Sequence, residues 1–203
     1  MDSPVAVIAI FCVAGYLIGS LSFAVLVSRA FGLPDPHGYG SGNPGATNVL
    51  RSGKKLAAAL TLVGDTSKGW VAVYLAQRLA GDYAIGDAGV AGVAIAAFLG
   101  HLFPLYFGFR GGKGVATALG ILLALNLGLG VAALATWLAV ALLFRISSLA
   151  ALVAAALAPL FSIALGGIDA TAVAVSAMSL LLIWRHRANL RRLLTGEEAK
   201  IGR

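Results

Sequence analysis

The most constraining feature of the sequence is a stretch of thirty residues, 115–144, that contains no charged side chain. A helix that crosses a membrane needs ~20 apolar residues. Five further apolar runs cover residues 5–28, 56–79, 90–109, 146–165 and 170–184. Over the whole chain 60% of residues are hydrophobic and 11% are charged, against ~45–50% and ~25% in soluble domains. We therefore predict an all-α integral membrane protein, and we exclude a disordered chain, a nucleic-acid-binding module and an ordinary soluble enzyme.

The uncharged stretch fits either one long helix or two short ones, and the basic residues distinguish the two. With one crossing, Arg145 and the basic segment 185–192 would lie on opposite sides of the membrane. With two crossings and a turn near 126–130, the basic loops share one side, which should be the cytoplasm; Arg78 is the only misplaced cation. We predict a single domain, 1–203, with seven transmembrane helices, some of them short. Its N-terminus is expected on the outer side of the membrane and its C-terminus on the cytoplasmic side.

The first apolar run, 5–28, is expected to be a retained span and not a cleaved signal peptide, because no basic residue precedes it. Cys12 is the only cysteine, so an intrachain disulfide and a thiolate metal site are not expected. The histidines carry no metal-binding pattern; His37 is expected in a loop, and His101 packed and hydrogen-bonded. We predict neither a metal nor another cofactor.

A polar, glycine-rich segment, 38–51, follows the first run. A flexible linker is one interpretation, but a linker needs no cluster of hydrogen-bonding side chains. Glycines allow positive φ and close approach of the backbone, so successive N–H groups can surround an anion. We therefore predict a binding site for a phosphate-bearing substrate. Its side chains are Ser41, Asn43, Thr47, Asn48 and Arg51.

A second glycine-rich segment, 108–117, directly precedes an apolar helix. Backbone donors, a lysine and the positive end of the helix dipole meet there, which suits a phosphate. The segment is not a Walker A loop, because its glycines are too close together and glycine follows the lysine. An ATPase is therefore disfavoured, and Arg110 needs no role beyond topology. The predicted phosphate-binding residues are Gly111, Gly112, Lys113, Gly114 and Thr117.

A third polar segment, 185–200, ends the chain. His186 and Asn189 are three residues apart, so they share a helix face and are candidates for chemistry. For Arg187, Arg191 and Arg192 we prefer a basic amphipathic surface that faces anionic lipid.

Two smaller features allow alternative interpretations. Asp65 and Lys68 lie within an apolar run, where ionisable residues are usually functional. A structural ion pair, with a helix break beside it at Gly64, is equally consistent with their spacing. Ser147 and Ser148 lie at the start of the run 146–165, and either could cap a helix or bind a ligand.

The three polar segments together resemble the motifs of a known family. The strings GSGNPGATNVLR at 40–51, GHLFP at 100–104 with GGKGVAT at 111–117, and HRAN at 186–189 with GEEAK at 196–200 are similar to those of the bacterial membrane acyl-phosphate:glycerol-3-phosphate acyltransferases, the PlsY family. The resemblance implies acyl phosphate as donor and sn-glycerol 3-phosphate as acceptor. The implied products are 1-acylglycerol 3-phosphate (lysophosphatidic acid) and phosphate, in the first step of phospholipid synthesis. It also implies seven transmembrane helices in the bacterial inner membrane and a site on the cytoplasmic face.

The resemblance assigns roles to residues. Ser41 and Arg51 correspond to essential residues of the first motif, His186 and Asn189 to active-site residues, and Glu198 to a structural residue. We assign Arg51 and Lys113 to the two phosphates, with Ser41, Ser148 and Asn189 orienting the acceptor. The predicted site residues are of three kinds: catalytic Ser41, Arg51, Lys113, His186 and Asn189; substrate-binding Asn43, Thr47, Asn48, Gly111, Gly112, Gly114, Thr117 and Ser148; and structural Asp65, Lys68 and Glu198.

The route of the proton stays open at this point. His186 is one candidate base, and the acceptor's own phosphate is the other, with His186 binding it. Ser41 as a covalent nucleophile is disfavoured, because direct transfer from a mixed anhydride needs none. No His-x4-Asp pattern follows any of the three histidines, so no thioester donor is implied.

Two rival functions remain, a transporter for anions and a non-catalytic lipid-binding protein. A transporter should place its site near the bilayer midplane between repeated halves, whereas the polar segments here gather on one predicted face. A lipid-binding protein would not need two glycine-rich anion sites. We expect the enzyme to work as a monomer in the bilayer, with no nucleic-acid partner.

Overall fold

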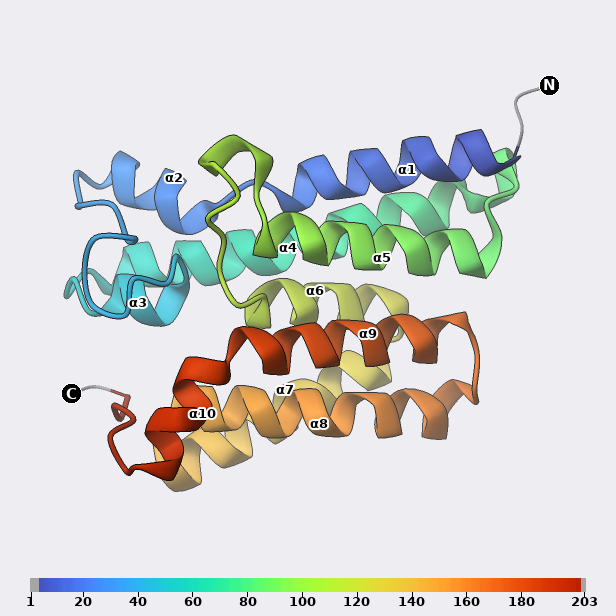
Figure 1. Ribbon diagram of the computed structural model, residues 1–203. Helices are drawn as coiled ribbons and strands as arrows, with labels where there is room; N and C mark the ends of the chain where they lie inside the picture. Colours follow the sequence, from blue (N-terminus) through green and yellow to red (C-terminus); the bar gives the residue numbers. More distant parts are fainter. Residues whose placement is uncertain (1–3, 202–203) are drawn as a thin grey trace.

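The computed structural model describes residues 4–201, and that part of the chain is all-helical, which confirms the predicted class. Figure 1 shows the succession of helices. They are α1 (Pro4–Gly19), α2 (Phe23–Ala30), α3 (Ala46–Leu50), α4 (Lys55–Tyr83), α5 (Gly86–Leu102), the 3-10 helix η1 (Leu105–Phe107), α6 (Val115–Leu125), α7 (Leu127–Phe144), α8 (Ser147–Gly166), α9 (Ala170–Arg185) and α10 (Arg187–Leu194).

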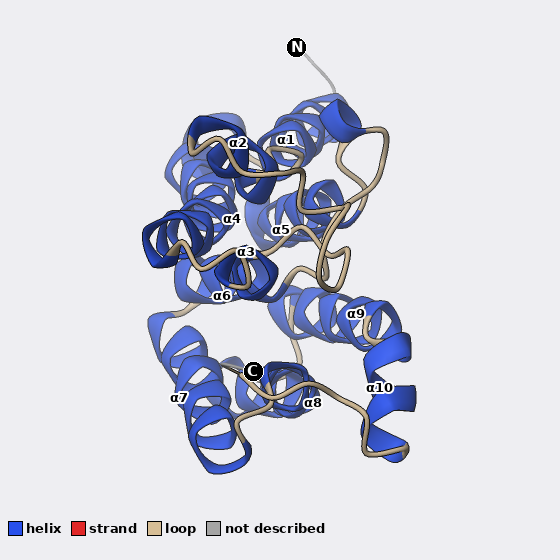
Figure 2. Ribbon diagram, turned by 90° about the vertical axis from the view of Figure 1, so that its left-hand side faces the viewer, coloured by secondary structure: helices blue, strands red, loops and turns tan. Residues whose placement is uncertain are grey.

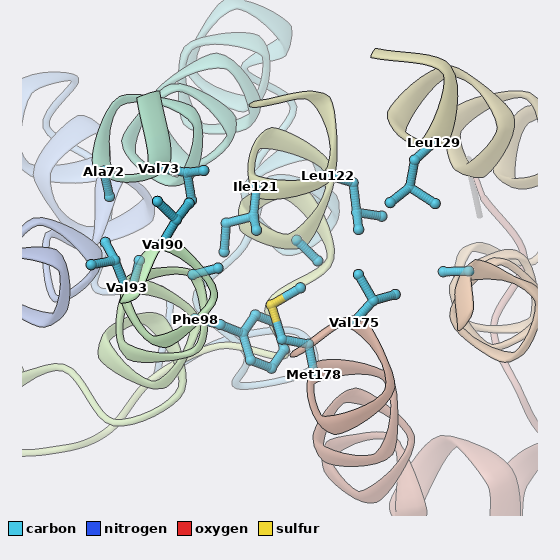
Figure 3. Close-up of a cluster of buried hydrophobic side chains, with 14 of the residues drawn as sticks. Ala72, Val73, Val90, Val93, Phe98, Ile121, Leu122, Leu129, Val175 and Met178 are labelled. Atoms are coloured by element: carbon cyan, nitrogen blue, oxygen red, sulfur yellow. The ribbon is translucent and has the colours of Figure 1, made fainter. Parts of the chain in front are cut away.

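The long helices pack side by side around α6. α1 packs on α5, α4 packs on both α5 and α6, and α9 packs on α5 and α8, while α7 joins α6 to α8. Figure 3 shows Ile121 and Leu122 of α6 in a cluster that Val73 of α4, Phe98 of α5 and Met178 of α9 also enter. α6 has only 11 residues, or ~16 Å at 1.5 Å per residue. A helix of this length is too short to cross a ~30 Å hydrocarbon core alone. In this fold α6 is surrounded by neighbouring helices, against which Ile121 and Leu122 are buried.

The uncharged stretch is broken at Asn126, as the charge argument predicted. Asn126 ends α6 and caps α7, where its side chain accepts a hydrogen bond from the backbone N–H of Leu129 at 3.1 Å. Within residues 4–201, four helical segments are long and apolar enough to cross a membrane by length and composition. They are Val5–Ala30, Gly86–Phe107, Leu127–Phe144 and Ser147–Gly166, and α6 and α9 are shorter apolar helices.

The helix breaks differ from the sequence interpretation at two places, although Val5–Ala30 remains one candidate span by length and composition. The first run is not one helix: α1 ends at Gly19 and α2 begins at Phe23. The Leu21 carbonyl, freed at this break, accepts a hydrogen bond of 2.5 Å from Lys68 Nζ. Conversely, α4 runs without a break through Gly64. A Cβ at Gly64 would overlap the ring of Phe23, so this glycine lets α2 approach α4.

Candidate active site

The buried Asn48 side chain holds the first polar segment together through hydrogen bonds. The side chain is buried, and its Oδ1 accepts hydrogen bonds from Ser41 N at 2.8 Å and Ser41 Oγ at 3.2 Å. Its Nδ2 donates to the carbonyls of Pro36 and Tyr39 at 2.9 and 3.1 Å. Gly40 has φ +59°, and a Cβ there would overlap Asn48 Oδ1. The segment is thus an ordered loop, and the contacts of Asn48 assign it to holding Ser41 in place.

The other predicted residues of this loop lie on its surface. Ser41, Thr47 and Arg51 are exposed, and Asn43 is half-buried. Thr47 Oγ1 lies 3.4 Å from Ser147 Oγ at the start of α8. The aliphatic part of Arg51 passes Gly40, where a Cβ would lie 3.1 Å from Arg51 Cδ. The first loop therefore contacts the beginning of α8 through Thr47, and the exposed Arg51 side chain lies beside Gly40.

The second glycine-rich segment is clamped from two sides. Gly112 N–H donates to the His101 carbonyl at 3.2 Å. Arg185 donates from Nε to the Gly112 carbonyl at 3.1 Å and from Nη2 to the Gly111 carbonyl at 2.6 Å. A Cβ at Gly111 or Gly112 would overlap atoms of His101, so neither position admits a side chain. Sequence analysis missed Arg185, which looked like any other topology cation; no local pattern marks a contact 73 residues away.

Lys113 and the N-terminus of α6 form the open side of this loop. Gly114, with φ +87°, is the cap of α6, so the first N–H groups of the helix are unpaired within it and suit an anion. A polar cavity of about 400 Å³ adjoins the loop. It is lined by His37, Gly42, Phe109, Arg110, Gly111 and Arg185. His37 Nε2 lies 2.8 Å from the Arg110 carbonyl, which ties the first loop to the second.

A series of buried polar side chains extends from Thr117, just after the second glycine-rich segment, into the helix bundle. Thr117 is fully buried, and its Oγ1 lies 3.1 Å from His101 Nδ1. His101 Nδ1 lies 3.8 Å from Asp65 Oδ1, which lies 2.8 Å from Lys68 Nζ. The expectation that His101 is packed and hydrogen-bonded is confirmed. The contacts of Thr117 place it beneath the loop, and those of Asp65 and Lys68 favour the structural interpretation.

His186 lies at the junction of α9 and α10. It is 2% exposed, and Nδ1 lies 2.8 Å from the Leu182 carbonyl. Because a carbonyl only accepts, Nδ1 carries the proton and Nε2 is left as an acceptor. Burial, aided by the nearby cations Lys113 and Arg185, lowers the pKa of His186 to about 4. The imidazole is therefore neutral near neutral pH.

Glu198 joins the C-terminal segment to α8 and α10. Its Oε1 accepts hydrogen bonds from Ser148 Oγ at 2.7 Å and Asn189 Nδ2 at 2.6 Å, and its Oε2 accepts one from Arg192 Nε at 2.6 Å. Burial alone would raise the pKa of Glu198, but these hydrogen bonds hold the pKa below its usual value. Neither Ser147 nor Ser148 is the cap of α8, which is Ile146. The contacts of Ser148 and Asn189 thus make Glu198 a structural hub, with Asn189 Oδ1 buried and unpaired among the described residues.

The three segments meet at one end of the helix bundle. Figures 1 and 2 place α3, the start of α6 and α10 together there. Burial lowers the pKa of Lys113 to about 8. Glu198 opposes the shift, whereas the cations Arg192, Arg185 and Arg51 add to it. The charges that act on Lys113 therefore come from the first and third segments, so the structure brings the predicted cations together with His186 and Asn189.

A pH dependence follows from this lysine. Lys113 is charged below a pKa of about 8 and neutral above it, so attraction for phosphate should be complete at lower pH and lost as pH rises. We expect kcat/KM, which reports the free enzyme, to fall from about pH 8 upward. The measurement is a pH profile of kcat/KM in detergent. In Lys113→Arg this alkaline limb should disappear; an identical limb in that variant would contradict the assignment.

Comparison with known proteins finds relatives that match nearly the whole chain. A family model described as "Glycerol-3-phosphate acyltransferase" matches residues 9–196. Glycerol-3-phosphate acyltransferases from Ralstonia nicotianae and Thiobacillus denitrificans are 64% and 63% identical, over 98% and 94% of this chain and 97% and 96% of theirs.

Two solved structures share the fold as well. Crystal structures of PlsY (YgiH), an integral membrane glycerol 3-phosphate acyltransferase, superpose with TM-scores of 0.89 for the glycerol 3-phosphate form and 0.87 for the lysophosphatidic acid form. They are 35% and 34% identical, and the match covers 96% of this chain and 96% and 95% of theirs. The segments that meet at the end of the bundle are those on which the sequence resemblance rests. This multi-pass membrane protein therefore belongs to the glycerol-3-phosphate acyltransferase family, the PlsY family.

Proposed function

We propose that the protein transfers a fatty acyl group from acyl phosphate to the 1-hydroxyl of sn-glycerol 3-phosphate. The observation that carries this proposal is that the three polar segments are joined at one end of the bundle: Arg185 binds the Gly111 and Gly112 carbonyls, and Arg51 and Glu198 act electrostatically on Lys113. Two phosphate groups, one on each substrate, need two sets of cations or backbone donors side by side. The solved relatives named for glycerol 3-phosphate and lysophosphatidic acid forms support the acceptor and the product.

The chemistry is a direct transfer between bound substrates. The acceptor hydroxyl oxygen attacks the acyl carbonyl carbon, the bond from this carbon to the phosphate oxygen breaks, and phosphate leaves with the electron pair. Holding both substrates in line converts the reaction into an effectively unimolecular one. We assign Arg51 and Lys113 to the phosphates, and Ser41 and Asn189 to the acceptor. No covalent Ser41 intermediate is needed, and the Ser41 hydroxyl lies against the Asn48 amide, not beside a histidine.

The pKa of His186 bears on where the hydroxyl proton goes. A group with a pKa of about 4 is a weak base near neutral pH, whereas a phosphate monoester has a second pKa of about 6. We therefore favour the acceptor's own phosphate as the base. His186 then accepts at Nε2 a hydrogen bond from the acceptor's other hydroxyl, on C2, and orients the acceptor, while the proton of the reacting 1-hydroxyl passes to the acceptor's phosphate.

His186→Asn separates these routes, because an amide oxygen accepts a hydrogen bond but takes up no proton. We expect KM for glycerol 3-phosphate to rise, with kcat reduced by no more than ~10-fold. Steady-state kinetics with both substrates varied give the two constants. A fall in kcat of ~10²–10⁴-fold at unchanged KM would identify His186 as the base instead.

The membrane arrangement belongs to the same proposal. We place seven transmembrane helices in a bacterial inner membrane, with the N-terminus outside and the polar end of the bundle in the cytoplasm, and the enzyme as a monomer. The break at Asn126 supports the two short helices that this count needs. With two crossings in the uncharged stretch the basic loops would share one side, as the positive-inside rule requires.

The donor is tested with purified protein in detergent. Palmitoyl phosphate and palmitoyl-CoA are offered separately with glycerol 3-phosphate, and lysophosphatidic acid is measured. We expect product from the acyl phosphate alone. Product from the CoA thioester would contradict the proposed donor, and product from neither in folded protein would favour an anion transporter.

A further inference from the structure

Arg185, the last residue of α9, connects the site's third segment to its second. Its guanidinium group donates to the carbonyls of both Gly111 and Gly112. It also lies over the ring of Phe103, 5.7 Å from the ring centre. The residue is half-buried, unlike the neighbouring Arg187, which is exposed and rests on Trp184. An arginine that served only to keep its loop on the cytoplasmic side could be exposed, as Arg187 is.

The two hydrogen bonds determine how the peptide planes of the loop face. In a planar trans peptide, the C=O of one residue and the N–H of the next point in opposite directions. The first plane is held from both ends, because Arg185 binds the Gly111 carbonyl and the His101 carbonyl accepts the Gly112 N–H. In the second plane Arg185 binds the Gly112 carbonyl, so the Lys113 N–H points away from Arg185.

This orientation matters for an anion. A carbonyl oxygen turned toward a phosphate repels it, whereas an N–H group attracts it. The Lys113 N–H donates to no other residue in the part of the chain that the structure describes, so it is available for a ligand. Arg185 thus holds two carbonyl dipoles toward its own guanidinium group and leaves the Lys113 N–H on the opposite side of its peptide plane, where it can donate to an anion.

We propose that Arg185 is a positioning residue, which holds the Gly111–Gly112 carbonyls so that the Lys113 amide and side chain face a substrate phosphate. This inference rests on the proposed function, since it concerns the same phosphate loop. Lysine cannot replace the arginine here, because an ammonium group is a compact point charge and a guanidinium is a planar fork that spans two acceptors.

The test compares Arg185→Lys, which keeps the charge, with Arg187→Lys as a matched control on the exposed side. Two quantities are measured: kcat and KM for both substrates, and the melting temperature with and without glycerol 3-phosphate. In Arg185→Lys we expect kcat/KM to fall about 10- to 100-fold, mainly through KM, as a misplaced binding group causes. The ligand-induced rise in melting temperature should shrink, while the melting temperature without ligand stays near that of the wild type. Arg187→Lys should match the wild type in all of these.

A second variant, Arg185→Gln, removes the charge and offers a single amide nitrogen where the arginine uses both Nε and Nη2, and we expect it to lose at least as much kcat/KM as Arg185→Lys. Wild-type KM values in both variants would overturn the proposal. So would a lowered melting temperature with an unchanged ligand-induced rise, because Arg185 would then support the fold and not the loop. If the wild type makes no product, yet glycerol 3-phosphate raises its melting temperature and fails to do so in Arg185→Lys, the positioning role stands and the proposed reaction fails.

Discussion

Lys113→Met is expected to lower kcat/KM about 10²–10³-fold near neutral pH, the usual loss when one oriented group that stabilises developing anionic charge is removed. Methionine keeps the unbranched apolar stem but removes the charge. Lys113 is partly desolvated, since burial is the largest cause of its lowered pKa. Its charge should therefore act on a phosphate more strongly than an exposed lysine would.

The matched control for this variant is Lys55→Met. Lys55 is an exposed residue in the first turn of α4, so its replacement changes the net charge equally without touching the three polar segments. Lys55→Met should stay within about twofold of the wild type, as surface changes usually do. A Lys113→Met variant that keeps wild-type kcat/KM would remove this lysine from the site.

Lys68→Met is expected to destabilise the protein by about 3–5 kcal/mol, because it leaves the buried Asp65 carboxylate without its partner. The two side chains are only 2% and 3% exposed, and Lys68 Nζ lies 2.8 Å from Asp65 Oδ1. The variant also removes the donor to the Leu21 carbonyl at the break between α1 and α2. Thermal unfolding in detergent, followed by tryptophan fluorescence, should show a lower midpoint by roughly 10 °C.

The double variant Asp65→Asn/Lys68→Met serves as the control for charge. Removing both charges should restore much of the lost stability, since an uncharged buried pair costs less than one unpaired ion. If Lys68→Met melts like the wild type but loses activity, the pair belongs to the chemistry and the structural interpretation is wrong.

The sequence alone predicted those features of the fold that a single residue type determines, namely the break in the uncharged stretch and the glycine-rich loops. The break of the uncharged stretch followed from the positions of distant basic residues, and it occurs at Asn126, whose side chain caps the next helix. The glycine-rich segments were recognised from their glycines and the polar residues among them. The structure gives the reason for these glycines, because Gly40 and Gly114 adopt positive φ and Gly111 and Gly112 leave no space for a side chain.

The direction of individual polar groups did not follow from the sequence. Asn48 and Thr117 lie in the predicted segments, but both side chains turn inward to hold the loops. At the break between α1 and α2, the Leu21 carbonyl accepts a hydrogen bond from Lys68, 47 residues further along the chain. Such partners are determined by tertiary packing, which overrides local helix propensity.

The most direct test of the proposed reaction is its mass balance in a single assay. Wild-type protein receives acyl phosphate with a labelled acyl chain and glycerol 3-phosphate with a second label, and released phosphate is counted together with the lipid product. The account predicts one doubly labelled lysophosphatidic acid for each phosphate released, with both lost in parallel in Lys113→Met. Phosphate released without the doubly labelled lipid would contradict it, because the acyl group would then be passing to water and not to the acceptor.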